Sequence, residues 1–395
     1  MPETPSQTPP HRRTVLRVVL ATQLVMALLT ALVVTVAYQR IDGRIEAGGE
    51  IPHEVSKKRH DGPKAPLNIL VMGIDERDCE GCGIDEEGGG GGSDVSILLH
   101  ISADRRSAYG VSLPRDAMVA RPDCRTAEGR VAGEDPAMFN TAYAVGGPTC
   151  AVQTVESLTG LFIDHYLVLE FGGFVDMVDA VGGVTVCLPK AVNDPAHNIF
   201  LDAGTQVLDG RDSLNYVRER TQLSVTGDIG RMKRQQAFIA SLLNRVLSAD
   251  TLAQPTRIYD FLSAVADSIQ VDEDLDSLRK LADLAMEFRH TDLADIRFVT
   301  VPFEAYPPDE NRLQWSPEAS RLWKRIAADQ PLGAEFSDDS ITVADPPDGT
   351  AGEPSGSPSG RPSQGGGTGN GGGGAGGSDE EDARRAQALA NGLCA

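Results

Sequence analysis

Short apolar stretches rich in β-branched residues recur along the chain and are typical of buried strands. They are 67–75, 95–102, 165–171, 183–188 and 296–303. Between them, 148–159 and 173–180 have helical spacing, a longer amphipathic helix follows from Ile229, and 272–289 reads as a further helix. This alternation predicts an α/β fold, with one central mixed β-sheet flanked by helices.

A longer apolar stretch precedes these elements. Residues 18–38 carry no charge, and 21 residues rising about 1.5 Å each span a hydrocarbon core. Arg12, Arg13 and Arg17 stand on the N-terminal flank, whereas acids and bases mix on the other, so the N-terminus is predicted to be cytoplasmic. The alternative is a cleaved signal peptide. An uncleaved single-pass anchor is favoured, because no clear small-residue cleavage site follows Val36.

Composition sets the remaining boundaries. Residues 1–17 form a short basic cytoplasmic segment, 18–38 the membrane helix, and 39–66 a stalk with no apolar period. The globular domain is expected over 67–331, outside the cytoplasm. Residues 332–395 are rich in Gly, Pro, Ser and acidic residues, which predicts a disordered tail.

The charge balance excludes one class of partner. The formal net charge is −21, whereas nucleic-acid proteins carry basic surfaces, so nucleic acid is not expected to bind. The sequence also lacks H-E-x-x-H, G-x-S-x-G and G-K-[ST] motifs, which removes support for the corresponding enzyme classes.

Six cysteines follow the apolar stretch, on the side where disulfides persist. They are Cys79, Cys82, Cys124, Cys150, Cys187 and Cys394. Sequence alone leaves their connectivity open. A bridge between Cys124 and Cys150 would staple a long loop, although Cys187 competes for either partner. A local disulfide is the favoured interpretation of Cys79 and Cys82, over a redox or zinc site.

Arginines in turn-like contexts form a candidate anion site. They are Arg115 in Ser112-Leu-Pro-Arg-Asp116, Arg218 and Arg220 in Tyr216-Val-Arg-Glu-Arg220, and Arg231 with Arg234 in the block that starts at Gly227. Guanidinium groups donate paired hydrogen bonds to phosphate oxygens. Gly227 or Asp228 is a suitable N-cap, which would place Arg231 in a first helical turn and on one face with Gln235. For any single arginine, a solvated surface charge is the simpler interpretation.

Two carboxylates flank the first two predicted strands. Asp75 ends one strand and Asp94 opens the next, so pairing of these strands would bring both to one sheet edge. Such oxygen ligands beside a pyrophosphate suit Mg²⁺. Capping or solvation is the competing interpretation.

These blocks, in this order, resemble the LytR-CpsA-Psr family over about residues 67–248. The matching blocks are Leu70-Val-Met-Gly-Ile-Asp75-Glu-Arg77, Ser93-Asp94, Ser112-Leu-Pro-Arg-Asp116, Phe139-Asn-Thr-Ala-Tyr143, Val181-Gly-Gly183 and the stretch 208–236. The cysteine positions and the tail are similar to those of actinobacterial members. Gly92 and Met138 stand where the family often has Arg and Lys, which leaves the substrate open.

The resemblance implies a membrane-anchored phosphotransferase that moves a glycan phosphate from a polyprenyl-pyrophosphate carrier to a peptidoglycan hydroxyl. It implies Mg²⁺ at Asp75 and Asp94, with Asp75, Arg115 and Arg220 as catalytic residues. The pyrophosphate-binding set would be Arg115, Arg218, Arg220, Arg231 and Gln235. Two alternatives remain, namely a non-catalytic sensor of lipid-linked intermediates and a pyrophosphatase that uses water as the acceptor.

Overall fold

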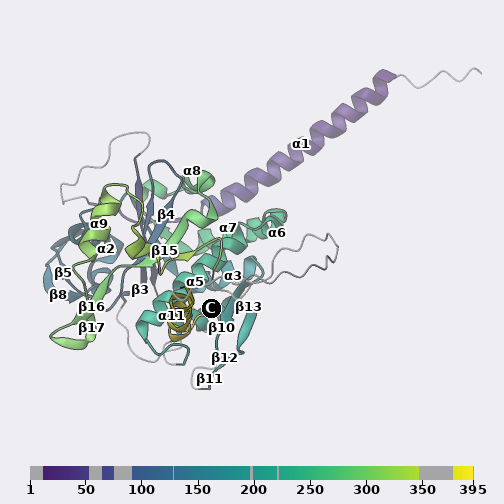
Figure 1. Cartoon of the computed structure of the whole chain (residues 1–395). Helices are drawn as coiled ribbons and strands as arrows, with labels where there is room; N and C mark the ends of the chain where they lie inside the picture. Colours follow the sequence, from purple (N-terminus) through teal and green to yellow (C-terminus); the bar gives the residue numbers. More distant parts are fainter. Residues whose placement is uncertain are drawn as a thin grey trace, which may run out of the picture.

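The computed structural model describes residues 12–52, 65–74, 91–127, 129–195, 199–219, 222–346 and 377–394 of the chain. A central sheet with helices on both faces forms the body, and one long helix projects from it (Figure 1). The predicted α/β class with a mixed sheet is confirmed.

In the described part of the chain, eight strands form the central sheet, in the order β1-β14-β9-β2-β3-β4-β15-β18. Their bounds are Glu46–Ala47 (β1), Leu67–Ile74 (β2), Ser93–Ile101 (β3), Ala108–Ser112 (β4), His165–Glu170 (β9), Ile269–Val271 (β14), Ile296–Thr300 (β15) and Ile341–Thr342 (β18). β2 pairs in parallel with β9 and antiparallel with β3, while β4 pairs antiparallel with β3 and in parallel with β15. Four of the five predicted strands therefore lie in this sheet.

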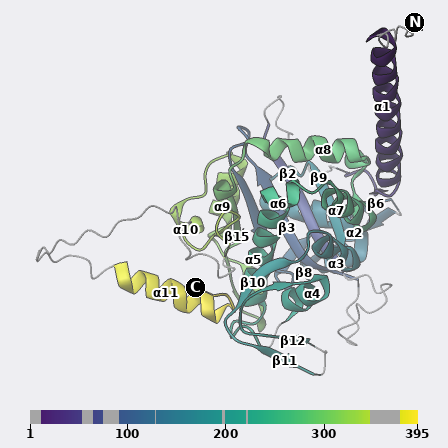
Figure 2. The same cartoon turned by 90° about the vertical axis from the view of Figure 1, so that its right-hand side faces the viewer.

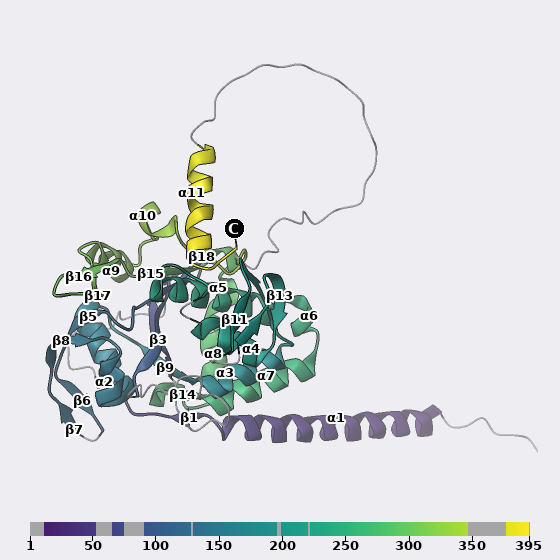
Figure 3. The ribbon, with the colours of Figure 1, turned by 90° about the horizontal axis from the view of Figure 1, so that it is seen from below.

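Alternate side chains of the strands supply two apolar layers. Leu70 and Leu98 pack with α2 (Thr141–Thr159) and α9 (Ala319–Ala327). Leu99, on the opposite face of β3, packs against the cluster that α5 (Asp228–Val246) contributes to. Figure 3 shows α2 and α9 on one side of the strands and α5 on the other. Successive side chains point to opposite faces, and both faces are buried, so the central strands are apolar at almost every position.

The remaining helices are mostly short. They are α3 (Phe171–Ala180), α4 (Gly210–Arg218), α6 (Ala249–Leu252), α7 (Pro255–Ser268), α8 (Leu278–Glu287) and α10 (Ala334–Ser337). α10 packs through Phe336 on the first face with α2 and α9, and helices such as α3, α4 and α7 cover the second. The helix predicted over 272–289 was too long. Asp272 caps a 3₁₀ turn, Glu273–Leu275, and Ser277 accepts from the Lys280 N–H to start α8. Such side-chain oxygens accept hydrogen bonds from the first backbone amides of a helix, so each of them marks a new helix start within 272–289.

Within the described residues, five two-stranded sheets accompany the central sheet. They pair β5 (Met118–Arg121) with β8 (Glu134–Met138), β6 (Cys124–Thr126) with β7 (Gly129–Val131), β10 (Val184–Leu188) with β13 (Gly204–Leu208), β11 (Val192–Asp194) with β12 (Ile199–Leu201), and β16 (Phe303–Tyr306) with β17 (Asp309–Trp315). Placing 183–188 in the central sheet was therefore wrong. β10 buries its apolar side chains against α3 and α4 instead, and an apolar strand gains as much from that contact as from a sheet interior.

The N-terminal helix α1 (Arg12–Asp42) contains residues 15–42, which are long and apolar enough to cross a membrane. Figure 2 shows α1 standing beside the body. Its last turn is docked, because Ile41 is buried and the Leu278 N–H donates to Asp42 Oδ1 over 2.8 Å. β1 then joins β14 at the sheet edge. The stalk predicted over 39–66 is thus shorter, since residues up to 52 already pack on the body and 53–64 lie outside the described residues.

The boundary predicted near Pro331 is also wrong. β18 extends the sheet beside β15, and Val343 is fully buried. At the other end of the expected disordered tail, α11 (Gly377–Ala390) leads into Leu393, which is buried with residues of α5 and β15. Both ends of 332–395 therefore belong to the domain.

Two disulfides are formed among the described cysteines. Cys124 pairs with Cys150, one of the pairings that the sequence left open, and Cys187 pairs with Cys394 across 207 residues. Cys79 and Cys82 lie outside the described residues. The second bridge joins β10 to the chain end and is the covalent reason that the end stays on the body.

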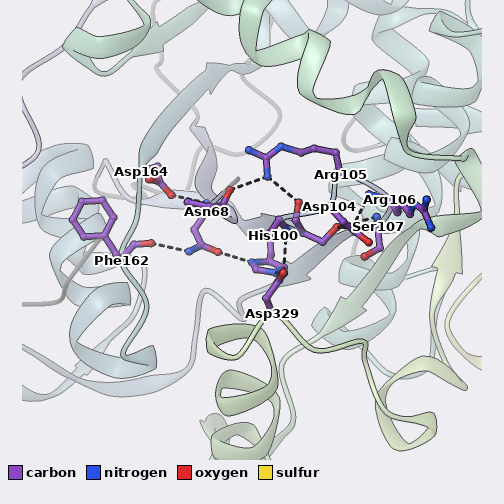
Figure 4. Close-up of polar contacts among 12 residues, drawn as sticks. Asn68, His100, Asp104, Arg105, Arg106, Ser107, Phe162, Asp164 and Asp329 are labelled. Carbon is purple, nitrogen blue, oxygen red and sulfur yellow. Dashed lines mark hydrogen bonds and ion pairs between the residues drawn. The ribbon is translucent and has the colours of Figure 1, made fainter. Parts of the chain in front are cut away.

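A buried polar cluster lies at the end of the sheet where β2 begins (Figure 4). His100 Nδ1 lies 2.8 Å from Asn68 Oδ1, and its Nε2 lies 3.2 Å from Asp329 Oδ1. The Asn68 amide also donates to the Phe162 carbonyl. Because the polar atoms of this cluster bond to one another, the cluster has a structural role at this end of the strands. A functional site is therefore expected at the opposite end of the strands.

Candidate functional site

Polar residues lie at the start of β3 and at the end of the neighbouring strand β4. β3 begins at Ser93, and β4 ends at Ser112, which pairs with Ile97, so the start of β3 and the end of β4 lie at the same end of the sheet. A cleft opens there against the first turns of α5. It is lined by Asp94, Val95, Ser96, Ser112, Leu113, Pro114, Arg115, Asp116, Asp228, Arg231, Met232, Gln235 and Leu313. Four of the predicted site residues, namely Asp94, Arg115, Arg231 and Gln235, thus share one cleft.

Arg115 projects into this cleft between carboxylates. Its Nη1 lies 2.5 Å from Asp94 Oδ1, and its Nε lies 3.5 Å from Asp116 Oδ2. Burial lowers the pKa of the Arg115 guanidinium, but the carboxylates of Asp116, Asp94 and Asp228 raise the pKa by more. Arg115 therefore stays protonated and presents a fixed positive charge.

Asp116 was not among the predicted site residues, although it belongs to the same motif. Burial first, and then a hydrogen bond with Asp228, raise its pKa above the ordinary value. Arg312 Nη1 of β17 lies 3.4 Å from Asp116 Oδ1. Asp116 therefore belongs to a charged cluster with Arg115, Asp228 and Arg312. No local signal pointed to Arg312, because 196 residues separate it from Asp116.

The first turn of α5 supplies the second arginine. Gly227, at φ 59°, is the N-cap, so the α5 amides begin at the cleft as predicted. Arg231 Nη2 lies 3.1 Å from Asp228 Oδ1, and the Arg231 side chain is only 6% exposed. Gln235, one turn further, lines the same cleft, which confirms the predicted shared face.

Gln236 fixes α5 to the sheet beside the cleft. Its amide nitrogen lies 2.9 Å from Ser112 Oγ and 2.9 Å from Thr300 Oγ1, and the side chain is fully buried. One glutamine thus holds the ends of β4 and β15 and the start of α5 together. This contact therefore links the strand that precedes Arg115 to the helix that carries Arg231.

Arg218 lies beside the cleft rather than in its lining. The guanidinium stands 5.2 Å from the centroid of the Phe171 ring, at the end of β9. Gln235 donates to the Val217 carbonyl over 3.2 Å, which connects the end of α4 to the α5 face. Arg218 is therefore a neighbour of the site on the β9 side.

Arg234, which also belongs to the arginine block, is structural. It is fully buried, donates to the Glu219 carbonyl, and lies 3.7 Å from the Glu219 carboxylate. Burial lowers the pKa of Arg234. It holds the segment that leads to Arg220 and is shielded from solvent.

Asp75 and Arg220 lie outside the described residues. Of the residues that precede them, Ile74 pairs with Ser93 at the start of β3, and Glu219 lies 3.7 Å from the buried Arg234. The assignment of both as site residues stays a prediction.

The donor set suits a hard cation only in part. Within the described residues there is no group of three or more His, Cys, Asp or Glu side chains arranged for a metal ion. Asp94, Asp116 and Asp228 nevertheless line one cleft, and Mg²⁺ takes one or two protein carboxylates with phosphate and water. Asp94 fits that requirement.

Residues 37–324 match the LytR_cpsA_psr family model. The chain is 37% identical over 231 residues to a probable cell wall biosynthesis protein, LcpB, of Corynebacterium glutamicum, covering 57% of this chain and 52% of that one. It is 32% identical over 316 residues to the cell wall biosynthesis protein LcpA of the same organism, covering 73% and 60%. A polyisoprenyl-teichoic acid–peptidoglycan teichoic acid transferase, TagU, of Oceanobacillus iheyensis is 35% identical over 224 residues, covering 55% and 62%. The chain thus spans between half and two thirds of the length of these relatives.

Solved structures share the fold. A LytR-Csp2A-Psr enzyme from Actinomyces oris superposes with a TM-score of 0.54 at 20% identity, covering 72% of this chain and 96% of that one. The protein gbs0355 from Streptococcus agalactiae gives 0.54 at 26% identity, covering 68% and 89%. The family match extends over most of the central sheet and the whole cleft. The chain therefore belongs to the LytR-CpsA-Psr family.

Proposed function

We propose that this protein is a membrane-anchored phosphotransferase that attaches a cell-wall glycopolymer to peptidoglycan. The carrying observation is the convergence of Arg115, Arg231, Gln235 and Asp94 in one cleft at the sheet edge. Names of relatives point the same way, because the Oceanobacillus iheyensis relative is named a transferase of polyisoprenyl-linked teichoic acid to peptidoglycan.

The cleft has the chemistry for a pyrophosphate. Arg115 and Arg231 are held at fixed positions by carboxylates, so they need little reorganisation to receive phosphate oxygens. The α5 N-terminus adds backbone amides and the positive end of a helix dipole. Arg218 and Arg220 complete the proposed binding set.

Asp94 and Asp75 would hold Mg²⁺. When bound, the ion neutralises charge on the phosphate oxygens. Asp94 already forms an ion pair with Arg115, so a bound phosphate would share the Arg115 guanidinium with Asp94. Omission of Mg²⁺ should abolish transfer, and Asp94→Asn should raise the Mg²⁺ concentration needed for half-maximal activity.

In the proposed reaction, a hydroxyl of the peptidoglycan acceptor attacks the phosphorus that bears the glycan. The new P–O bond forms as the bond to the bridging oxygen breaks, and polyprenyl phosphate leaves. Asp75 takes up or orients the hydroxyl proton. The arginines stabilise the charge that develops on the phosphate oxygens.

The apolar part of α1 supports a reaction at a membrane. Residues 15–42 fit a single crossing, and the basic residues before it favour a cytoplasmic N-terminus. The cleft then lies outside the cytoplasm, within reach of a carrier lipid in the outer leaflet.

The test is transfer from a polyprenyl-pyrophosphate glycan to peptidoglycan by the full chain in membranes, with Mg²⁺. Arg115→Ala combined with Arg220→Ala should lower the rate by about a hundredfold or more. Arg321→Ala, 60% exposed on α9, is the matched control and should retain full activity. Unchanged transfer in the double variant contradicts the site. Free phosphorylated glycan as the sole product would identify a pyrophosphatase instead, and donor binding without any product would identify a sensor.

A further inference from the structure

A second hollow lies beside the cleft. It has a volume of about 430 Å³ and lies between the β5–β8 pair and the β16–β17 hairpin. Its lining includes Met118, Glu134, Met138, Tyr306, Asp309 and Arg312. Figures 1 and 3 both show these two strand pairs side by side. We name this hollow the hairpin groove.

The hairpin groove and the cleft share a wall. Arg312 lines the groove, whereas the next residue, Leu313, lines the cleft. Arg312 Nη1 lies 3.4 Å from Asp116 Oδ1, and Asp116 lines the cleft beside Arg115. Leu313 also forms a parallel bridge with Ala117. A molecule bound in the groove would therefore lie next to the cleft, close to Arg115 of the proposed phosphate-binding set.

The lining of the groove suits a neutral sugar. Tyr306 offers a half-buried ring, and Met118 and Met138 add apolar surface. Glu134 and Asp309 accept hydrogen bonds from hydroxyl groups, and Arg312 donates them. A pyranose ring presents an apolar face and a rim of hydroxyl groups, so it matches an aromatic ring flanked by such groups.

The same charges disfavour an anion. Arg312 is the cation of the groove lining, and it is already shared between Asp116 at 3.4 Å and Asp309 at 4.0 Å. The other carboxylate of the lining, Glu134, lies 3.2 Å from Arg121 Nη2, so the charges of the groove lining are already paired and attract an anion only weakly.

The groove also lies on the side from which the acceptor should approach. Arg218 and Phe171 mark the β9 side of the cleft, next to the apolar cluster of α3 and α4. Val119 of β5 packs with Leu70 and Leu98 on the face of the sheet that α2 covers, whereas the cluster of α3 and α4 contacts Leu169 on the other face. Attacking and leaving oxygens stand on opposite sides of the phosphorus. A carrier lipid on the apolar side therefore leaves the groove to the attacking sugar.

We propose that the hairpin groove is the acceptor subsite, which binds a neutral saccharide of the cell wall and presents its hydroxyl to the phosphate in the cleft. This inference rests on the proposed phosphotransfer. Tyr306 supplies the stacking surface, and Glu134 orients the ring through its hydroxyl groups.

The test separates acceptor from donor. With the full chain in membranes, the KM for peptidoglycan glycan oligosaccharides and the KM for the lipid-linked donor are measured independently. Tyr306→Ala should raise the acceptor KM by about tenfold and leave the donor KM unchanged. Tyr306→Phe keeps the ring and should restore the wild-type value. Glu134→Gln, an isosteric change on an exposed residue, should raise the acceptor KM by a smaller factor.

Glu310→Gln is the matched control, because Glu310 lies on the same hairpin and is not part of the groove lining. An unchanged acceptor KM in Tyr306→Ala and Glu134→Gln overturns the inference, and so does an equal rise of both KM values. If wild-type protein transfers nothing, the proposed function fails first. Binding of the oligosaccharides to the full chain by NMR then decides the groove separately, since Tyr306→Ala should weaken binding and unaltered binding would refute the assignment.

Discussion

Thr226 donates a hydrogen bond to the Asn391 side chain over 3.0 Å, although 165 residues separate them. The Val225 N–H donates to the Ala390 carbonyl, also over 3.0 Å, and Arg234 reaches the Asn391 carbonyl. The chain end therefore supports the loop between α4 and α5. That loop connects Arg218 to the helix that carries Arg231.

Asn391→Ala should weaken donor binding without touching the cleft. Loss of the contact with Thr226 frees the loop before α5, so we expect a several-fold rise in the donor KM. Thr226→Val should give a similar rise, and the double variant should add little to either change. Gln387→Ala, exposed on α11, is the control. Additive effects in the double variant would contradict the coupling.

Removal of the Cys187–Cys394 bridge should destabilise the domain. The bridge closes a loop of 207 residues, and loss of such a constraint costs about 2–5 kcal/mol. Cys394→Ser should therefore lower the melting temperature under oxidising conditions. Under strong reduction the variant and the wild type should melt alike. A difference that persists after reduction would show that the serine itself, rather than the lost bond, is responsible.

Gln236→Leu should affect both stability and activity. The change leaves the Ser112 and Thr300 hydroxyls without their amide partner, which should lower the free energy of unfolding by about 1–3 kcal/mol. Because the same amide sets α5 against the sheet, the donor KM should also rise. Urea unfolding and transfer kinetics measure the two effects. A stability loss with unchanged kinetics would show that Arg115 and Arg231 keep their positions without it.

Asp116 should give the domain a pH dependence of defined sign. Its pKa is raised by burial and then by the hydrogen bond with Asp228, so the folded state keeps this proton to a higher pH than the unfolded state. Its contribution to stability is present below the unfolded pKa, about 4, and decreases as the pH rises from there towards the folded pKa. Asp116→Asn cannot titrate. Urea midpoints measured upwards from pH 4 should therefore fall less in the variant than in the wild type, and a steeper fall would contradict the sign.

The sequence predicted what depends on local pattern. Apolar period located β2, β3, β9 and β15, and the cap residue Gly227 located the start of α5 beside Arg231. It failed where long-range contacts decide. The segment 332–395 is too polar to predict a docked chain end, which depends on a bridge to Cys187 and on the burial of Leu393. Arg312 reaches Asp116 through a hairpin whose position no local motif encodes.

The docking of α1 limits how this protein can search for acceptors. Ile41 is buried and Asp42 is bonded to the start of α8, so the helix meets the domain without a free tether. In the proposed orientation, the cleft is held at a fixed height above the bilayer. Successive attachment points are then reached by lateral diffusion of the whole protein in the membrane plane, and only acceptor strands that pass within that height can be modified.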